Sequence, residues 1–352
     1  MRVNEGTNRR GAESAEKEEK EEKEENEEKE EFMSQIFGQK SFSYERGLVE
    51  RSVGWLYAFW KFSRPHTVIG TSLSVLGLYL MAVAMSSTGF SSTQVGQLLG
   101  VWIACLCGNV YIVGLNQLED VAIDRINKPH LPLAAGEFSL RSAQVIVGIT
   151  GSLALLLAWL LGPFLLGMVG ISLAIGTAYS LPPIRLKRFP FWAAVCIFSV
   201  RGAIVNLGLF LHFSWVLHRN QSIPPSVWAL TLFVLVFAFA IAIVKDIPDM
   251  EGDRLYNIST LTLQMGQQAV FNLARWVLTV CYLGMALAGL IWLTSLNLVF
   301  LVTTHLVALG FMWYWSLQVD LQDKSAVTRF YQFIWKLFFL EYLIFPAACL
   351  LS

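Results

Sequence analysis

Nine long apolar stretches are the feature that most limits what this chain can fold into. They cover residues 66–86, 96–117, 142–162, 164–182, 190–212, 226–246, 270–293, 297–317 and 331–351. A helix needs about 20 apolar residues to cross a bilayer, and these stretches have that length. Only 15% of the residues are charged, whereas soluble domains have about 25%. An open sheet would leave backbone groups unsatisfied in lipid, so the sequence predicts an all-α integral membrane protein with nine transmembrane helices.

The first 53 residues differ in character from the rest. Residues 13–31 read ESAEKEEKEEKEENEEKEE, a charged low-complexity run without an apolar face. Such a run cannot bury a core, so we expect residues 1–53 to form a disordered tail and residues 54–352 to form the membrane domain. The tail lacks the apolar core of a signal peptide and is too acidic for a transit peptide. We expect either that Met33, which follows the run, is the natural start or that the tail is dispensable.

The basic residues predict the orientation of the bundle. Of the 16 Lys and Arg residues beyond residue 52, 14 lie on the side of the bundle where the first helix begins and the even-numbered helices end. Arg219 lies on the other side, and Arg201 lies inside the fifth stretch. By the positive-inside rule, the side with 14 basic residues faces the cytoplasm and the C-terminus faces away from it.

Acidic residues gather in two segments that follow the second and sixth stretches. Beyond residue 52 there are 11 acids, and eight of them lie in residues 116–137 (NQLEDVAIDRINKPHLPLAAGE) and 245–254 (KDIPDMEGDR). The two motifs are Asn116, Asp120 and Asp124, spaced by four residues, and Asp246, Asp249 and Asp253, spaced by three and four. This spacing predicts that each motif lies on one face of a helix that continues past the apolar stretch. Glu119 and Glu251 would then face elsewhere and be solvated.

The two motifs predict a magnesium site. Like charges at helical spacing repel, and carboxylates near a bilayer are costly, so a cation must compensate. Mg²⁺ prefers oxygen ligands and usually takes only one or two protein carboxylates together with substrate phosphates. We therefore predict that all six motif residues bind Mg²⁺, that the five aspartates are catalytic, and that the ions bridge a diphosphate. The alternative is a surface network of ion pairs with Arg125, Lys128, Lys245 and Arg254.

Basic residues on the same side are candidates for binding the diphosphate, which both guanidinium and ammonium groups can do. They are Lys128, Arg185, Lys187, Arg188, Lys245 and Arg254. Each one taken singly is explained equally well as a determinant of topology. Arg201 differs, because an unpaired charge inside a membrane helix is costly. Its partner could be an acceptor carboxylate, the diphosphate or an acid such as Asp246, whereas Asn206 and Glu341 are best explained by hydrogen bonds between helices.

The two acidic motifs resemble those of the UbiA family of membrane prenyltransferases. That family has an NxxxDxxxD motif after its second helix and another aspartate motif after its sixth. The segments WKFSRPHTVIGTSLSV, GTAYSLPPIRLKRF and FYQFIWKLFFLEY extend the resemblance over about residues 57–352. They are similar to the cyanobacterial and plastid members of the family that act on homogentisate.

The resemblance implies a fold and an activity. The fold is nine helices around a central cavity, which the two motif loops cap on the cytoplasmic side. A tyrosine and a lysine near the diphosphate would come from the fourth helix and the loop after it. Tyr179 and Lys187 are the candidates, although the spacing does not choose between Lys187, Arg185 and Arg188. The activity is Mg²⁺-dependent transfer of a phytyl group from phytyl diphosphate to homogentisate with loss of CO₂. The product, 2-methyl-6-phytylbenzoquinol, belongs to tocopherol biosynthesis, and the implied location is a cyanobacterial plasma or thylakoid membrane.

Two kinds of alternative stay open. The same chemistry could use geranylgeranyl or solanesyl diphosphate as the donor, or 4-hydroxybenzoate, a naphthoate or chlorophyllide as the acceptor. The alternative outside enzymes is a transporter or cation channel with acidic vestibules. The acids lie at one membrane face and the chain has no inverted repeat, which disfavours transport. The partners we expect are the two substrates and the lipid bilayer, with no nucleic acid and no obligate protein partner.

Overall fold

The structure, a computed structural model, describes residues 48–85, 92–218, 222–256 and 258–352. The chain divides into two units, residues 1–55 and residues 56–352. Of the first unit only residues 48–55 are described, which begin helix α2 (Leu48–Phe62). Most of the predicted charged tail and Arg219 lie outside the described residues. All that follows concerns the second unit.

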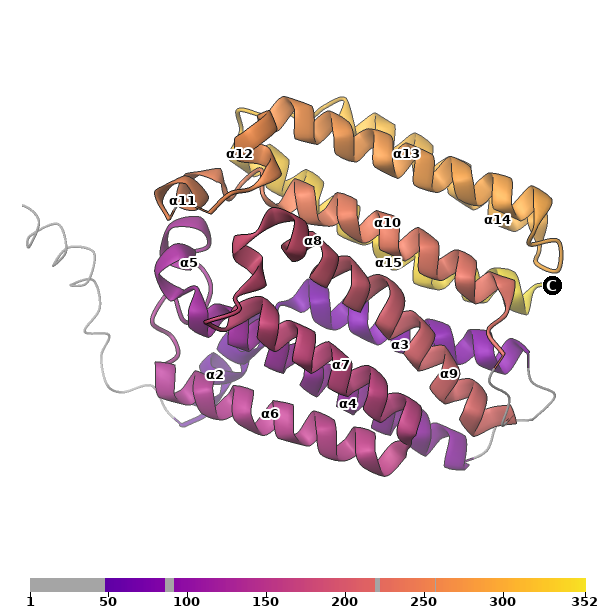
Figure 1. The fold of residues 1–352 in the computed structure, drawn as a ribbon, viewed down its shortest axis with the longest axis horizontal. Helices are drawn as coiled ribbons and strands as arrows, with labels where there is room; N and C mark the ends of the chain where they lie inside the picture. Colours follow the sequence, from indigo (N-terminus) through magenta and orange to yellow (C-terminus); the bar gives the residue numbers. More distant parts are fainter. Residues whose placement is uncertain (1–47, 86–91, 219–221, 257) are drawn as a thin grey trace, which may run out of the picture. The chain divides into compact units, whose positions relative to one another are not determined.

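Within its described residues, this unit has nine spans that are long and apolar enough to cross a membrane (Figure 1). The first four are α3 (Pro65–Ala84), α4 (Ser92–Glu119), α6 (Leu140–Leu161) and α7 (Pro163–Ser180). The fifth is built from α8 (Pro190–Phe198), a six-residue π-helix η2 (Ser199–Ile204) and α9 (Val205–His218). The last four are α10 (Pro225–Lys245), α13 (Gln267–Ile291), α14 (Leu298–Ser316) and α15 (Lys324–Leu350). The predicted all-α fold with nine membrane-spanning helices is confirmed, although α15 begins at Lys324 rather than at residue 331.

Prolines mark where several spans begin. Pro65, Pro163, Pro190 and Pro225 occupy the first turn of α3, α7, α8 and α10. Proline suits this position because its fixed φ is helical and its missing N–H would have no helical partner there. The tight turn between α6 and α7 is made by Gly162, whose φ of 145° disfavours other residues.

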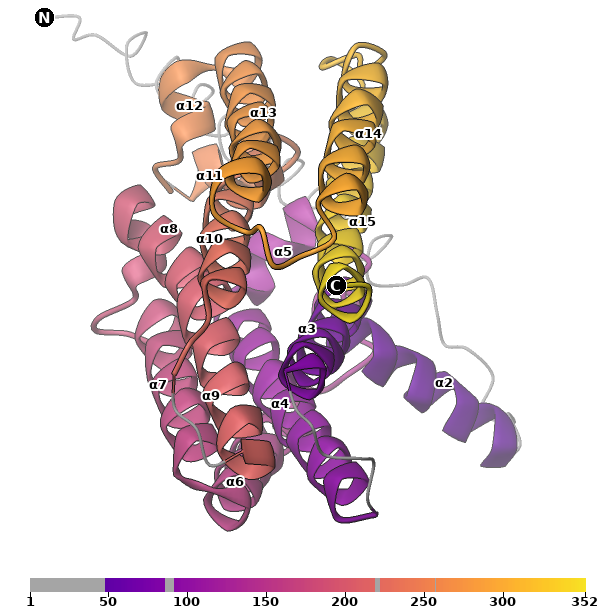
Figure 2. The same cartoon turned by 90° about the vertical axis from the view of Figure 1, so that its right-hand side faces the viewer.

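Six of the nine spans surround a central cavity of about 260 Å³, and three lie outside it. The cavity is lined by α3, α4, α7, the span α8–η2–α9, α10 and α15. Neighbours in this ring are in contact, and α15 closes the ring by packing on α3. The helix α6 packs on α4 and α7, while α13 and α14 pack outside α10 and α15 (Figure 2). The most buried span is α10, which agrees with its apolar character on all sides.

Glycines allow several of these helices to approach closely. A Cβ added to Gly77 of α3 would lie 2.9 Å from the backbone oxygen of Tyr342 in α15. A Cβ added to Gly114 of α4 would lie 2.7 Å from atoms of both Phe62 and Val147. Small residues at helix crossings are typical of membrane bundles, where close packing replaces the hydrophobic drive for association.

The prediction that each acidic motif continues its membrane helix is wrong. Helix α4 ends at Glu119, and Asp120 (φ −114°, ψ 15°) caps a separate short helix, α5 (Val121–Asn127). The Asp120 carbonyl accepts the Asp124 N–H at 2.8 Å, which is how an N-cap residue starts a new helix. Helix α10 ends at Lys245, and a turn leads into α11 (Met250–Leu255). Pro248 explains this second break, because it lacks an N–H and disfavours helical backbone at the residue before it.

The two short helices that follow the breaks lie side by side. Figure 1 shows α5 and α11 together at one end of the unit, beyond the ends of α4 and α10. Two further short elements lie at the same end: η1 (Leu186–Arg188) leads into α8, and α12 (Leu261–Met265) leads into α13. The breaks therefore turn both motifs away from their membrane helices and toward each other.

Candidate active site

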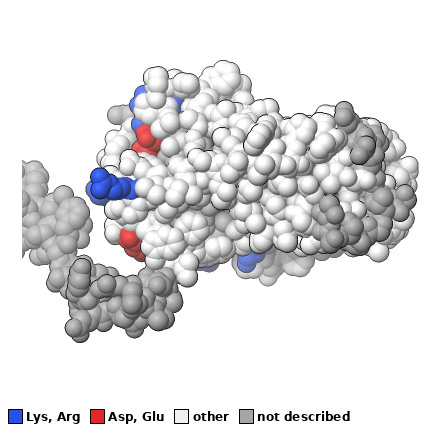
Figure 3. Space-filling view, turned by 90° about the horizontal axis from the view of Figure 1, so that it is seen from below, with Lys and Arg blue, Asp and Glu red and all other residues white. Residues whose placement is uncertain are grey.

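A polar cavity of about 120 Å³ lies where the two acidic motifs meet. All six predicted motif residues line it, together with cationic side chains from neighbouring elements. On the face drawn in Figure 3, most of the charged side chains gather at this end, and most of the remaining surface is uncharged. We call this cavity the polar mouth.

Asp120 is the centre of the first motif. Its Oδ1 accepts hydrogen bonds from Lys187 Nζ at 2.7 Å and from Arg185 Nη2 at 3.2 Å. Its Oδ2 accepts one from Asn116 Nδ2 at 3.0 Å. Arg64 completes the group by donating to Asn116 Oδ1 at 3.3 Å. The first motif is thus held between α3 on one side and the η1 segment on the other.

Two of these arginines have unusual backbone conformations. Among the described residues other than glycine, only Arg64 (φ 54°) and Arg185 (φ 38°) have a positive φ. A left-handed backbone is unfavourable for a long side chain and costs about 1–3 kcal/mol where it is maintained. Such strain concentrates at functional sites, and here both strained residues contact the first motif.

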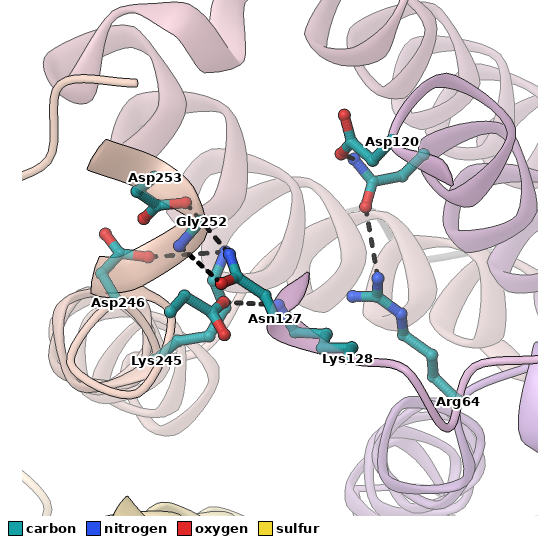
Figure 4. A network of polar contacts seen from close by, with 10 residues as sticks. Arg64, Asp120, Asn127, Lys128, Lys245, Asp246, Gly252 and Asp253 are labelled. Atoms are coloured by element: carbon teal, nitrogen blue, oxygen red, sulfur yellow. Dashed lines mark hydrogen bonds and ion pairs between the residues drawn. The ribbon is translucent and has the colours of Figure 1, made fainter. Parts of the chain in front are cut away.

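The second motif is paired with lysines. Lys128, which follows α5, donates to Asp249 Oδ2. Lys245, the last residue of α10, lies 3.6 Å from Asp246 Oδ1. Figure 4 shows Asp246 beside Lys245 and Lys128, with Asp120 and Arg64 on the other side of the view. The Lys128–Asp249 pair therefore joins the first acidic segment to the second motif.

A backbone contact fixes α5 against α11. The Gly252 N–H donates to Asn127 Oδ1 at 3.0 Å, and Asn127 Nδ2 lies 3.4 Å from Asp253 Oδ1. A Cβ at Gly252 would lie only 2.4 Å from Asn127 Oδ1, so only glycine fits there without a shift. Asn127 thus links α5, which carries Asp124, to α11, which carries Asp253.

Burial disfavours the charged forms of several groups at the polar mouth. It raises the pKa of the Asp124 and Asp246 carboxyls. It raises the pKa of Asp253 to about 7, and the neighbouring Asp249 and Asp246 charges add to the effect. Burial also lowers the pKa of Lys187, although Asp120 opposes this. Burial therefore makes the ionised forms of Asp124, Asp246 and Asp253 costly, a cost that a bound cation would offset.

The residues present fit Mg²⁺. Their donors are carboxylate oxygens, which this ion prefers, and Asp124 Oδ2 is buried without a hydrogen-bond partner. In the described part of the chain, no three His, Cys, Asp or Glu side chains converge on one point. Such a cage is not needed for Mg²⁺, which usually takes one or two carboxylates and completes its shell with phosphate and water.

The polar mouth adjoins the central cavity. Arg64, Asn116, Tyr179 and Lys245 line both. Deeper in the central cavity, the walls are mostly apolar and aromatic, and include Trp335 and Phe338. The arrangement suits a substrate with an anionic head and an apolar tail.

The structure brings together most of the predicted substrate-binding residues. Lys128, Tyr179, Lys187 and Lys245 line the polar mouth, and Arg185 reaches it through Asp120. Arg254 is exposed and lines neither cavity, and Arg188 is also exposed. Of the three basic residues that spacing could not separate, Lys187 and Arg185 therefore contact the motif.

Three predictions inside the membrane can also be compared with the structure. Arg201 lines the central cavity, and Asp246 is not its partner, because Asp246 pairs with Lys245. The predicted helix–helix hydrogen bonds of Asn206 and Glu341 are confirmed. Tyr342 Oη donates to Asn206 Oδ1 at 2.7 Å, and His305 Nε2 lies 2.9 Å from Glu341 Oε1.

Sequence reasoning missed Arg64, His66 and Asn127 as site residues. Arg64 and His66 line the central cavity, and Asn127 links α5 to α11. Arg64 was counted only as a determinant of topology, since nothing in the sequence shows its left-handed backbone. For Asn127, a signal was present, because it lies within the acidic segment and could have been weighed with the aspartates.

Together, the helical ring, the two acidic motifs and the two neighbouring cavities are those of a membrane enzyme with a charged site above an apolar cavity. The chain belongs to the UbiA prenyltransferase family, whose model matches residues 75–337. Its similarity to a homogentisate phytyltransferase identifies it as an aromatic prenyltransferase.

The chain is 55% identical to homogentisate phytyltransferase of Synechocystis over 294 residues, which cover 83% of this chain and 96% of the relative. It is 40% identical to homogentisate phytyltransferase 1 of Arabidopsis thaliana, over 83% of this chain and 75% of the relative. It is 37% identical to homogentisate geranylgeranyltransferase of Triticum aestivum, over 83% of this chain and 72% of the relative.

A solved structure shares the fold. The UbiA homologue of Archaeoglobus fulgidus, determined with GPP and Mg²⁺ bound, matches with a TM-score of 0.56 at 16% identity. The match covers 82% of this chain and 99% of that one. This agreement confirms the UbiA-like helical fold expected from the sequence.

Proposed function

We propose that this protein transfers a phytyl group from phytyl diphosphate to homogentisate with loss of CO₂. The observation that carries the proposal is the polar mouth, where two aspartate motifs and several cations meet above an apolar cavity. The 55% identity to a homogentisate phytyltransferase supports the choice of donor and acceptor. The product would be 2-methyl-6-phytylbenzoquinol, a precursor of tocopherol.

The diphosphate head of the donor binds in the polar mouth. Lys128, Lys187, Arg185 and Arg64 supply positive charge there, and guanidinium groups match phosphate oxygens in pairs. The aspartates of both motifs, with Asn116, would hold Mg²⁺. The chemistry that bound Mg²⁺ supplies is neutralisation of charge on the diphosphate, which makes it a better leaving group.

The apolar tail of the donor lies in the central cavity. When the allylic C–O bond breaks, its electron pair leaves with the diphosphate, whose charge the basic side chains stabilise. An electron-rich ring carbon of the acceptor then forms the new C–C bond, and the ring gives up the proton from that carbon. The carboxylate leaves as CO₂, and the methylene carbon that keeps the electron pair takes up a proton to become the methyl group of the product. The apolar walls exclude water from the allylic cation, and aromatic rings that line the cavity, such as those of Tyr179 and Tyr331, stabilise it by cation–π contact.

We also propose an orientation and a location. The polar mouth faces the cytoplasm, because the basic residues flank that side. The membrane would be the plasma or thylakoid membrane of a cyanobacterium, because the chain is 55% identical to a relative from Synechocystis.

A second candidate keeps the acceptor and changes the donor to geranylgeranyl diphosphate. The 37% identity to homogentisate geranylgeranyltransferase supports it. The two donors have the same head and the same number of main-chain carbons, so the polar mouth does not distinguish them.

The test is a membrane assay of the full chain with labelled homogentisate and Mg²⁺. Phytyl and geranylgeranyl diphosphate are supplied separately and in competition. We expect a labelled lipophilic product that forms faster with the phytyl donor and disappears with EDTA. Product with another aromatic acid but none with homogentisate would refute the acceptor, and EDTA-resistant turnover would refute the role of Mg²⁺.

A further inference from the structure

Arg201 lies on the π-helix η2, in the middle of a membrane span. A π-turn is rare and is frequently found at functional sites. The neighbouring Gly202 packs so tightly on α10 that a Cβ would lie 2.7 Å from the Cα atom of Leu235. The local distortion is thus held in place, and Arg201 lines the central cavity.

The Arg201 guanidinium has aromatic neighbours but no acidic partner. Its Cζ lies 4.8 Å from the Trp335 ring centroid and 5.8 Å from that of Phe338. In the part of the chain that the structure describes, no ion pair includes Arg201, and the buried Glu341 is paired with His305. Cation–π contact offsets only part of the free-energy cost of desolvating a charge in the membrane interior. The site therefore favours an anionic ligand.

Arg201 lies deeper in the membrane unit than the polar mouth does. Gly70 is close to the guanidinium, because a Cβ there would lie 3.5 Å from Arg201 Nη1. Gly70 follows Arg64 by six residues, which is about 9 Å along a helix axis. In the proposed function, the basic side chains of the polar mouth already bind the diphosphate. The better ligand for Arg201 is therefore a second, separate anion.

The wall between Arg64 and Arg201 is aromatic. The rings of His66 and Trp335 lie 4.8 Å apart, and Tyr331 lies 6.4 Å from His66. All three line the central cavity. Such a wall suits a flat ring placed between the mouth and Arg201.

We propose that Arg201 binds the carboxylate of the aromatic acceptor and so selects for aromatic acids. This inference rests on the proposed function and deepens it. A guanidinium pairs with a carboxylate through two parallel hydrogen bonds, which fix the direction of the ring as well as its presence. Because the reaction removes this carboxylate as CO₂, the product keeps no group for Arg201 and is released more readily than the acceptor.

Equilibrium binding to the purified full chain in nanodiscs tests the role of Arg201. The probes are labelled homogentisate, its ring without the carboxylate (methylhydroquinone), and phytyl diphosphate with Mg²⁺. The variants are Arg201→Gln and Arg201→Lys. The matched control is Arg275→Gln. Like Arg201, Arg275 lies in a membrane-spanning helix and contacts two aromatic rings, those of Phe271 and Trp313. Unlike Arg201, it lines neither cavity.

We expect Arg201→Gln to weaken homogentisate binding at least about tenfold, the size of one lost charged hydrogen bond. Binding of phytyl diphosphate and of methylhydroquinone should stay within about twofold of wild type. Arg201→Lys should recover part of the loss, and Arg275→Gln should bind like wild type. A merely structural role would instead weaken all three probes together.

Two further results would overturn the proposal. One is unchanged homogentisate binding in Arg201→Gln, and the other is loss of phytyl diphosphate binding with homogentisate unaffected. Failure of the proposed function appears separately, in the wild-type enzyme. If it binds and prenylates 4-hydroxybenzoate rather than homogentisate, the same comparison with that acid still decides the role of Arg201.

Discussion

Asp120 is held by three side chains, those of Asn116, Arg185 and Lys187. It also caps α5, so its backbone sets the direction in which the first motif leaves α4. Asp120 thus determines a local turn of the backbone and also holds several polar and charged side chains together. Its loss should disturb the chemistry of the mouth more than the packing of the bundle.

We predict that Asp120→Asn lowers kcat/KM at least about 100-fold, because a group that organises charge at a reacting centre contributes on that order. Asparagine keeps the shape and the cap but not the charge that Lys187 and Arg185 face. The measurement is phytyl transfer in membranes with equal amounts of inserted protein. The control is Asp320→Asn, because Asp320 is an exposed acid outside both cavities. Equal activity of the two variants would contradict the prediction.

At this scale, the sequence identified acids better than it identified their partners. Eleven acids beyond residue 52 leave few candidates, so their grouping was informative. Arg64 reaches Asn116 and Arg185 reaches Asp120, both from a left-handed backbone that no local sequence pattern predicts. Asn127 depends on the approach of Gly252 from a segment 125 residues away.

Among the helices, the contact between α3 and α15 closes the ring around the central cavity. Gly77 lies at this crossing, where the nearest atom to an added Cβ would be a backbone oxygen. A backbone atom cannot move aside as the end of a flexible side chain can. The crossing therefore sets the distance between two walls of the cavity.

We predict that Gly77→Ala destabilises the protein by about 1–3 kcal/mol, the usual cost of overpacking. Gly284→Ala in α13 is the matched control, since no atom lies within 4 Å of an added Cβ there. It should be neutral or stabilising by up to about 1 kcal/mol, because alanine favours helix more than glycine does. Thermal unfolding of both variants in one detergent measures the difference. A melting temperature of Gly77→Ala equal to that of Gly284→Ala would be inconsistent with the crossing described.

Apolar length was enough to predict the nine spans, because lipid leaves the backbone few alternatives to helix. It was not enough to predict where the helices break. Pro248 was a readable signal for the end of α10, whereas α4 ends at a residue with no such signal. The π-turn at Arg201 also depends on packing against α10, so spacing alone does not reveal it.

Across the whole membrane unit, both motif helices lie at the same end as most basic loop residues. By the positive-inside rule, this distribution favours the proposed orientation of the polar mouth toward the cytoplasm. The loop between α13 and α14 lies at the opposite ends of the spans and contains the exposed Ser295.

We predict opposite labelling of two single substitutions by a membrane-impermeant maleimide. Ser295→Cys should react in intact cells, whereas Glu251→Cys should react only after the membrane is opened. Glu251 and Ser295 are both exposed, so access rather than burial decides the result. Wild-type protein gives the background from the five native cysteines. The reverse pattern would place the polar mouth on the outer side.

The junction of a polar mouth with a cavity inside the membrane unit also affects how the enzyme meets its donor. A prenyl diphosphate is dissolved in the bilayer, so the enzyme encounters it by diffusion in two dimensions. The quantity that governs its supply is then the number of donor molecules per lipid, not the number per volume of water. Adding lipid at a fixed amount of donor dilutes the substrate and slows turnover, although nothing about the protein has changed. Growth or shrinkage of the host membrane therefore acts on the rate as directly as synthesis of the donor does.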